Sequence, residues 1–77
     1  MNTVEIKRHD DGTWDCNCEF LHVFATGHSK QEAIDDFVVQ CEYFKDVYAS
    51  TPEDKCTGLA LRLKERWART TIRRNKR

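Results

Sequence analysis

Residues 26 to 37 read T-G-H-S-K-Q-E-A-I-D-D-F, and this stretch marks the point where a turn gives way to a helix. Ser29 is a favourable N-cap residue, because its hydroxyl can accept a hydrogen bond from an unpaired amide of the first helical turn. Glu32 follows three residues later and can reach back to the Ser29 amide, which completes a capping box. Gly27 permits a sharp turn beforehand. The stretch therefore predicts a helix that begins at about Lys30.

The residues before this stretch predict three β-strands. Residues 4–8 alternate apolar and polar side chains, as a half-buried strand does. Asp10-Asp11-Gly12 then indicates a hairpin turn, because an Asp-Gly pair tolerates positive φ. A second strand follows, and its inward face would carry Trp14, Cys16, Cys18 and Phe20. The alternation changes phase at residues 20–22, which indicates a bend or bulge and then a third strand, with Leu21, Val23 and Ala25 in register and Phe24 on the opposite face.

The residues after this stretch predict two helices. The first runs from about residue 30 to 49, and its apolar stripe consists of Ala33, Ile34, Phe37, Val38, Cys41, Phe44 and Tyr48. Thr51 is a plausible N-cap for the second helix, with Pro52 at the first helical position. Its apolar residues recur at helical spacing and are Cys56, Leu59, Ala60, Leu63 and Trp67.

A short fourth strand over residues 56–63 is the alternative to the second helix. Leucines alternate there after Gly58, and a glycine inside a helix costs about 1 kcal/mol relative to alanine. The helical pattern is preferred. The sequence therefore predicts an α+β fold, in which a small three-stranded antiparallel sheet is followed by a long helix and a second C-terminal helix.

The net charge of zero conceals a strong asymmetry along the chain. Residues 1–61 carry five Lys or Arg against twelve Asp or Glu, whereas residues 62–77 carry eight basic residues and one acid, Glu65. A chain of 77 residues forms one small domain with a marginal core. We therefore expect a single domain over residues 1–77 that has an acidic body and a basic C-terminal helix and tail, and charged partners for one end or both.

The order of the elements and two motifs resemble the N-terminal domain of the HicB-like antitoxin family. The motifs are I-K-R-H-D-D-G-T-W at 6–14 and F-A-T-G-H-S-K-Q-E-A-I-D-D-F at 24–37, and the resemblance covers roughly residues 4–49. It implies a small module without catalytic residues that neutralises a basic RNA-cleaving toxin by covering its surface; some members also regulate transcription. The chain departs from the family at 19–23, where a loop with proline and glycine is usual, and after the first helix, where the family domain adds a strand.

Two surfaces are candidates for binding a partner. An acidic body can dock on a basic protein such as a toxin or nuclease, because charge complementarity speeds encounter and suppresses wrong partners. Its candidate residues are Asp10, Asp11, Asp15, Asp35, Asp36, Glu42 and Asp46. The basic segment can bind DNA or RNA, meet a second subunit, or simply offset a helix dipole. Its candidate residues are Arg62, Arg66, Arg69, Arg73 and Arg74.

The cysteines and histidines give no clear sign of an enzyme or a metal site. Cys16 and Cys18 form a C-x-C, Cys41 and Cys56 are isolated, and no ligand pair has the usual zinc spacing. Buried structural thiols are preferred over zinc ligands. No signal-peptide pattern and no apolar run near 18 residues is present. We therefore expect a cytoplasmic, non-catalytic binding protein without a cofactor, an inhibitor of antitoxin or phage type that forms a homodimer, with a nucleic-acid-binding regulator as the alternative.

Overall fold

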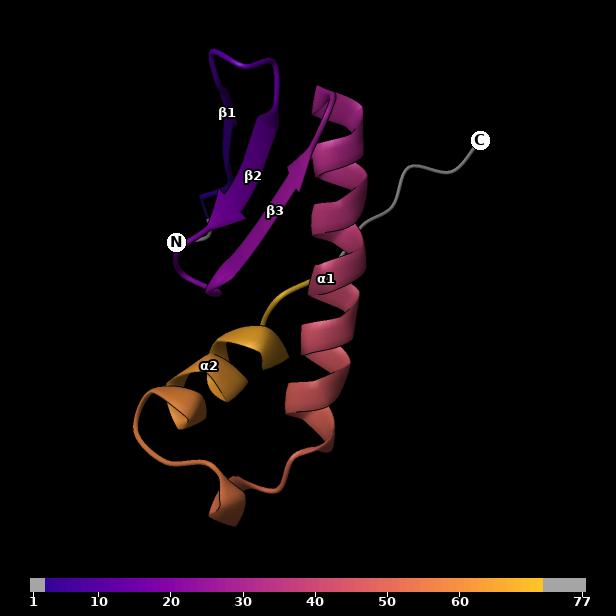
Figure 1. Cartoon of the computed structure of the whole chain (residues 1–77). Helices are drawn as coiled ribbons and strands as arrows, with labels where there is room; N and C mark the ends of the chain where they lie inside the picture. The colour runs from indigo at the N-terminus through magenta and orange to yellow at the C-terminus, as the bar shows by residue number, and fades with distance from the viewer. Residues whose placement is uncertain (1–2, 72–77) are drawn as a thin grey trace.

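The computed structural model describes residues 3–71 and has the element order β-β-β-α-α (Figure 1). The strands are β1 (Glu5–Arg8), β2 (Trp14–Cys18) and β3 (Val23–Gly27), which form one antiparallel sheet in the order β1-β2-β3. The helices are α1 (Lys30–Ser50), a short 3-10 turn η1 (Glu53–Lys55) and α2 (Leu59–Ala68). The predicted α+β fold is confirmed.

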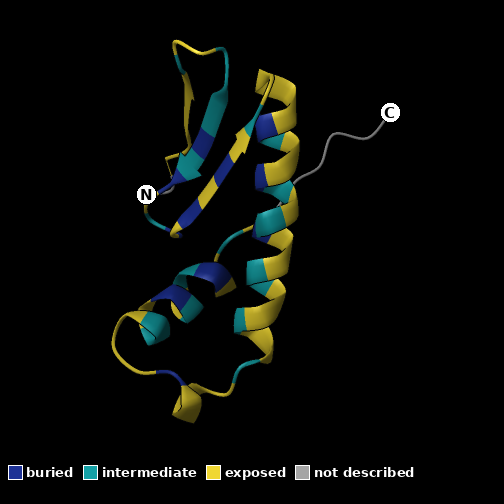
Figure 2. Ribbon diagram, viewed as in Figure 1, coloured by how far each residue is buried: buried dark blue, intermediate teal, exposed yellow. Residues whose placement is uncertain are grey.

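The sheet has one covered face and one open face. Strands β2 and β3 pair Cys16 with Ala25 and Cys18 with Val23, and all four of these residues are buried beneath α1. Side chains alternate between the two faces of a strand, so Asp15 and Phe24 lie on the face away from α1. Figure 2 shows the same alternation of buried and exposed residues along β3. The predicted period of two in β2 and β3 is confirmed.

The prediction that the first strand is half-buried is wrong. All four residues of β1 are exposed, and Ile6 is 42% exposed although it pairs with buried Cys16. The reason is the position of α1, which packs against β3 and β2 (Figure 1). Strand β1 is therefore an edge strand that gains its backbone hydrogen bonds from β2 but little apolar cover.

A tight turn joins β2 to β3, as the change of phase predicted. The His22 amide donates to the Glu19 carbonyl at 3.1 Å, and His22 has a φ of 56°, in the left-handed region. Leu21, Val23 and Ala25 are buried after the turn, whereas Phe24 is exposed. The bend thus resets the alternation so that the third strand also presents apolar residues to α1.

Helix α1 begins at Lys30 because Ser29 caps it. The Ser29 hydroxyl accepts from the Glu32 amide at 3.1 Å, as predicted. The other half of the predicted capping box is wrong: the Glu32 carboxylate accepts from the His28 amide at 2.9 Å, one residue before Ser29. Gly27 is required here by close packing, since a Cβ on it would lie 2.6 Å from the Ala33 amide nitrogen.

The core lies between the sheet and the two helices. Helix α1 buries Ala33, Phe37 and Cys41 within it, which confirms the predicted stripe. Helix α2 adds Leu63 and Trp67, and Trp67 is only 1% exposed. The remaining core residues are Cys16, Cys18, Leu21, Val23 and Ala25, with Trp14, Phe20, Ile34, Phe44 and Tyr48 packed partly against them.

The predicted start of the second helix is wrong. Residues 53–55 form only the 3-10 turn η1, and α2 begins at Leu59, directly after Gly58. Gly58 has φ 55° and ψ −123°, a conformation that side chains with a Cβ rarely adopt, so it separates the two segments. Thr51 donates its hydroxyl back to the Val47 carbonyl at 2.8 Å and caps no new helix. The alternative of a strand over residues 56–63 is also wrong, because α2 occupies residues 59–68.

A lysine of each helix donates hydrogen bonds to backbone carbonyls at the C-terminal end of the other helix. Lys45 of α1 donates from Nζ to the carbonyls of Trp67 and Thr70 at 2.8 and 2.7 Å. Lys64 of α2 donates from Nζ to the Tyr48 carbonyl at 2.6 Å. The last carbonyls of a helix lack intrahelical partners and carry partial negative charge. These two lysines therefore stabilise both helix ends and join α2 to α1.

Candidate interaction surfaces

The acidic residues predicted on the first helix all lie on exposed positions of α1. Asp35 accepts from the Gln31 side-chain amide at 2.8 Å, and Asp36 accepts from the Gln40 side-chain amide at 3.0 Å. Both bonds join residues four apart, so they order the carboxylates without neutralising them. Glu42 and Asp46 are exposed as well. The acidic face of α1 is thus directed away from the core.

An apolar stripe that we did not predict runs through this acidic face. Val39, Tyr43 and Val47 recur at intervals of four and are 54%, 64% and 38% exposed. At 100° per residue Val39 and Tyr43 lie on the far side of α1 from Phe37 and Cys41, and Val47 lies on the adjoining flank. We call this surface the outer face of α1: Val39, Tyr43 and Val47, with Asp35, Asp36 and Asp46 interleaved. Large apolar side chains that are exposed to solvent along one helix face are typical of an interaction site.

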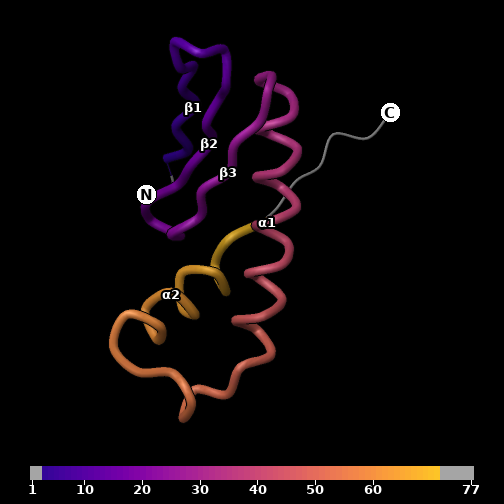
Figure 3. Tube along the Cα trace, viewed as in Figure 1, coloured from indigo at the N-terminus to yellow at the C-terminus, as the bar shows by residue number. Residues whose placement is uncertain are grey.

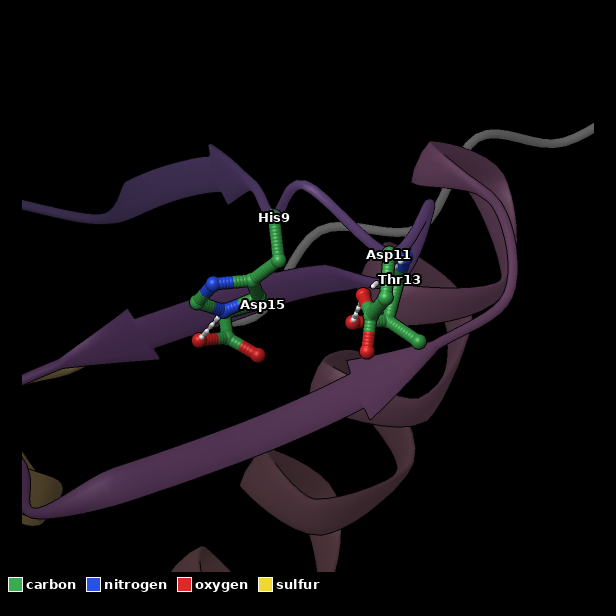
Figure 4. Close-up of polar contacts among 4 residues, drawn as sticks. All are labelled: His9, Asp11, Thr13 and Asp15. Atoms are coloured by element: carbon green, nitrogen blue, oxygen red, sulfur yellow. Dashed lines mark hydrogen bonds and ion pairs between the residues drawn. The ribbon is translucent and has the colours of Figure 1, made fainter.

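The acids predicted at the hairpin have different surroundings from one another (Figure 4). Asp11 accepts at Oδ1 from the Thr13 amide at 3.0 Å and from the Thr13 hydroxyl at 2.7 Å. These bonds hold the pKa of Asp11 below its ordinary value and close the turn. Asp15 pairs with His9 through Oδ2 and Nε2, on the sheet face away from α1. Asp10 is exposed.

The structure therefore divides the predicted acidic surface into two parts. The register pairs Trp14 with Gly27, so the hairpin lies at the same end of the molecule as the start of α1 (Figure 1). Asp10 and Asp11 are near this end, whereas Asp15 belongs to the open sheet face. The larger acidic surface is the outer face of α1.

The predicted basic residues differ in their contacts within the fold. Arg66 donates from Nη1 to the Phe20 carbonyl at 3.0 Å, and its guanidinium carbon lies 4.4 Å from the centre of the Phe20 ring. Arg62 and Arg69 are exposed on the same side of α2. Lys55, the basic residue that precedes them in the chain, lies in η1 and outside α2. Arg73 and Arg74 lie outside the described residues.

The four cysteines are unbridged thiols that lie in the interior, as preferred from the sequence. Burial raises the pKa of the Cys16 thiol, and it raises the pKa of the Cys41 thiol to about 11. A raised pKa disfavours the thiolate, which is the nucleophile and the metal ligand. Among residues 3–71, no cluster of three or more Cys, His, Asp or Glu is arranged to hold a metal ion. The thiols therefore pack as small apolar side chains.

Comparison with protein-family models, with curated proteins and with solved structures finds no match to this chain. The likeness to HicB-like antitoxins thus stays a prediction from two short motifs. Helix α2 follows α1 where that family adds a strand, so the departure noted in the sequence is also present in the fold. Within the described residues, neither helix is both long enough and apolar enough to cross a membrane.

The sequence signal for the outer face of α1 was the spacing of Val39, Tyr43 and Val47 itself. The apolar residues of α1 fall into two stripes rather than one, and only the stripe with Phe37 has a partner in the fold. The contact between Arg66 and Phe20 had no such signal, because 46 residues separate its two members.

Proposed function

We propose that this protein is a non-catalytic binding module, antitoxin-like or of phage-inhibitor type, that docks the outer face of α1 on a basic protein that acts on nucleic acid. The observation that carries the proposal is the exposed stripe Val39, Tyr43 and Val47 among the carboxylates of Asp35, Asp36 and Asp46. Tyrosine is one of the residues that most often carry the affinity of an interface, and the surrounding charges select the partner.

The acidic residues decide between the possible occupants of this face. A second copy of the chain docked through the same face would bring carboxylates against carboxylates, which opposes association. An anionic membrane surface would be repelled for the same reason. A protein with Lys and Arg around an apolar groove is complementary in both charge and polarity, and the nucleic-acid site of a nuclease or RNA-cleaving toxin has this charge.

The size of the face indicates how the partner extends over the molecule. From Asp35 to Val47 the helix rises about 18 Å, at about 1.5 Å per residue. A stable interface buries about 800 Å² on each partner, more than one helix face of this length offers. The partner therefore also covers neighbouring residues, and the exposed Asp10 at the hairpin lies at the end of the molecule where α1 begins.

The test is affinity capture from a lysate of the source organism, with and without nuclease, followed by calorimetry with the purified partner. The expected partner has a basic surface, remains bound after nuclease, and binds more weakly as salt rises. Reversal of Asp35, Asp36 and Asp46 to Lys should abolish binding. The matched control reverses three other exposed acids to Lys, for the same change in net charge: Glu19, Glu53 and Asp54.

A single substitution separates the apolar stripe from the charges. Tyr43→Ala should weaken binding by about thirtyfold, because a central aromatic anchor contributes about 2 kcal/mol or more. Equal affinity of the Asp35, Asp36 and Asp46 variant and its control would refute the docking face. Loss of all captured protein after nuclease would favour the nucleic-acid-binding alternative.

A further inference from the structure

A second candidate site lies on the other helix, at its junction with the sheet. Phe20, from the turn between β2 and β3, lines a hollow of about 480 Å³ together with three residues of α2 and the residue that directly follows this helix. The α2 residues are Arg62, Glu65 and Arg66, and the residue after the helix is its C-cap, Arg69. We call this the arginine hollow. It is separate from the outer face of α1 and has the opposite charge, so it does not depend on the function proposed above.

Arg66 gives the arginine hollow a fixed centre. One of its five N–H donors bonds to the Phe20 carbonyl at 3.0 Å, and its guanidinium lies over the Phe20 ring at 4.4 Å. Both contacts cross from α2 to the turn between β2 and β3, so they hold a long side chain that would otherwise be mobile. A guanidinium that is already ordered loses less conformational entropy when a ligand binds.

Arg62 and Arg69 extend this cationic surface along α2. They lie four residues before and three residues after Arg66, so all three guanidinium groups share one side over about 10 Å of helix. Both side chains are exposed, and neither has a hydrogen bond or ion pair with another described residue. The planar fork of arginine matches phosphate oxygens in pairs, which makes these two residues available to successive phosphates.

Glu65 and Phe20 are suited to contact the base of a nucleotide. A carboxylate repels phosphate but accepts a hydrogen bond from an amino group on a base edge, such as N4 of cytosine. Unpaired bases stack on aromatic rings and on guanidinium planes, and Phe20 with Arg66 presents both. A base in a duplex has its Watson–Crick edge already paired, so this combination suits a single strand.

We propose that the arginine hollow binds single-stranded nucleic acid, with Arg62 and Arg69 on phosphates, Phe20 and Arg66 beneath a base, and Glu65 on its amino group. This ligand fits the hollow better than the acidic surface of a second copy, since a protein carboxylate would need to lie beside Glu65. The contact leaves the outer face of α1 available to a protein.

The test is fluorescence anisotropy of the full chain with labelled single strands of about 12 nucleotides, a size within the usual range for such sites. The probes are oligocytidylate as RNA and as DNA, oligouridylate, and a duplex of equal length. The key variant is Arg62→Gln with Arg69→Gln, which leaves the Arg66 contact with Phe20 in place. Its matched control is Lys7→Gln with Arg8→Gln, two exposed basic residues on β1.

The expected result has three parts. The key variant should bind about tenfold more weakly than the parent chain, and the control should bind as the parent does. The slope of log K against log salt concentration should be smaller by about 1.4 for the key variant, because each lost phosphate contact on a single strand removes about 0.7 from that slope. Cytidylate should bind more tightly than uridylate, and Glu65→Gln should remove that preference. The single strand should bind more tightly than the duplex.

Equal affinity of the key variant and its control would overturn the proposal, as would the absence of saturable binding by the parent chain. Tighter binding to the duplex would overturn the single-strand assignment, and equal binding of cytidylate and uridylate would overturn the role of Glu65. The variant with Asp35, Asp36 and Asp46 reversed should retain nucleic-acid binding. Failure of this proposal is therefore distinguishable from failure of the docking face.

Discussion

Replacement of Lys45 by Met tests how α2 is held on the rest of the fold. The Lys45 ammonium donates to the carbonyls of Trp67 and Thr70 at 2.8 and 2.7 Å, at the end of α2. Met keeps most of the hydrocarbon stem but removes both charge-assisted hydrogen bonds. The substitution therefore isolates the polar contact from the packing of the side chain.

The expected loss follows from the number and exposure of these bonds. A hydrogen bond to a charged group contributes about 1.5–3 kcal/mol, and Lys45 makes two of them. Lys45 is half-buried, so water recovers part of the lost interaction, and we expect a net loss of about 2 kcal/mol. A domain of 77 residues has a total free energy of unfolding of about 4–12 kcal/mol. At about 4–8 °C per kcal/mol, Tm should fall by roughly 8–16 °C.

Denaturation in urea and by heat, followed by circular dichroism, measures this loss. Lys64→Met should cost less, about 1 kcal/mol, because it removes a single bond to the Tyr48 carbonyl. Lys55→Met is the control, since Lys55 is exposed on η1, and its effect should stay within about 0.5 kcal/mol. If Lys45→Met were as stable as Lys55→Met, the lysine contacts would not hold α2 on α1.

Three further predictions concern the pH dependence and the backbone. Burial raises the pKa of Cys41 to about 11, so ionisation of this thiol should leave the denaturant midpoint unchanged below its ordinary pKa of 9.0 and lower it as pH rises towards 11, a fall that Cys41→Ala should lessen. The hydrogen bonds from Thr13 lower the pKa of Asp11, so the hairpin should weaken only when the pH falls below 3.8, the ordinary pKa of this group, and the carboxylate is protonated. An NMR titration measures this, with Asp11→Asn as the comparison. Gly58→Ala should cost about 1–3 kcal/mol through its backbone alone, whereas Gly27→Ala should cost more in the same denaturation assay, because its Cβ would lie 2.6 Å from a backbone nitrogen.

The parts of the fold that the sequence predicted correctly depend on short-range signals. The Ser29 cap, the alternation of Cys16 and Cys18 and the turn at residues 10–12, where Gly12 has a φ of 91° and its amide donates to the His9 carbonyl, each depend on a few neighbouring residues. Such local signals predict the same structure regardless of how the rest of the chain packs. The start of α2 was predicted wrongly because Gly58 is compatible both with a helix interior and with a break, and only its positive φ decides between them.

The parts that the sequence did not predict depend on how the elements pack. The exposure of Ile6 follows from the position of α1 over β2 and β3, which the residues of β1 do not specify. The role of Arg66 depends on Phe20, which the turn between two strands brings to α2. The candidate surfaces changed for the same reason: Asp15 and Arg66 are engaged within the fold, whereas Tyr43 is left exposed.

Site-specific photo-crosslinking tests whether the outer face of α1 contacts a basic protein. A photoreactive phenylalanine analogue is placed at Tyr43, and in a second protein at Phe24, an aromatic position on the open face of the sheet that is also more than half exposed. Both proteins are irradiated in a nuclease-treated lysate of the source organism. We expect one basic protein to be crosslinked through position 43. An excess of the parent chain should compete for this crosslink, whereas the variant with Asp35, Asp36 and Asp46 reversed should not. The absence of a crosslink at position 43, or the same product from position 24, would contradict this expectation.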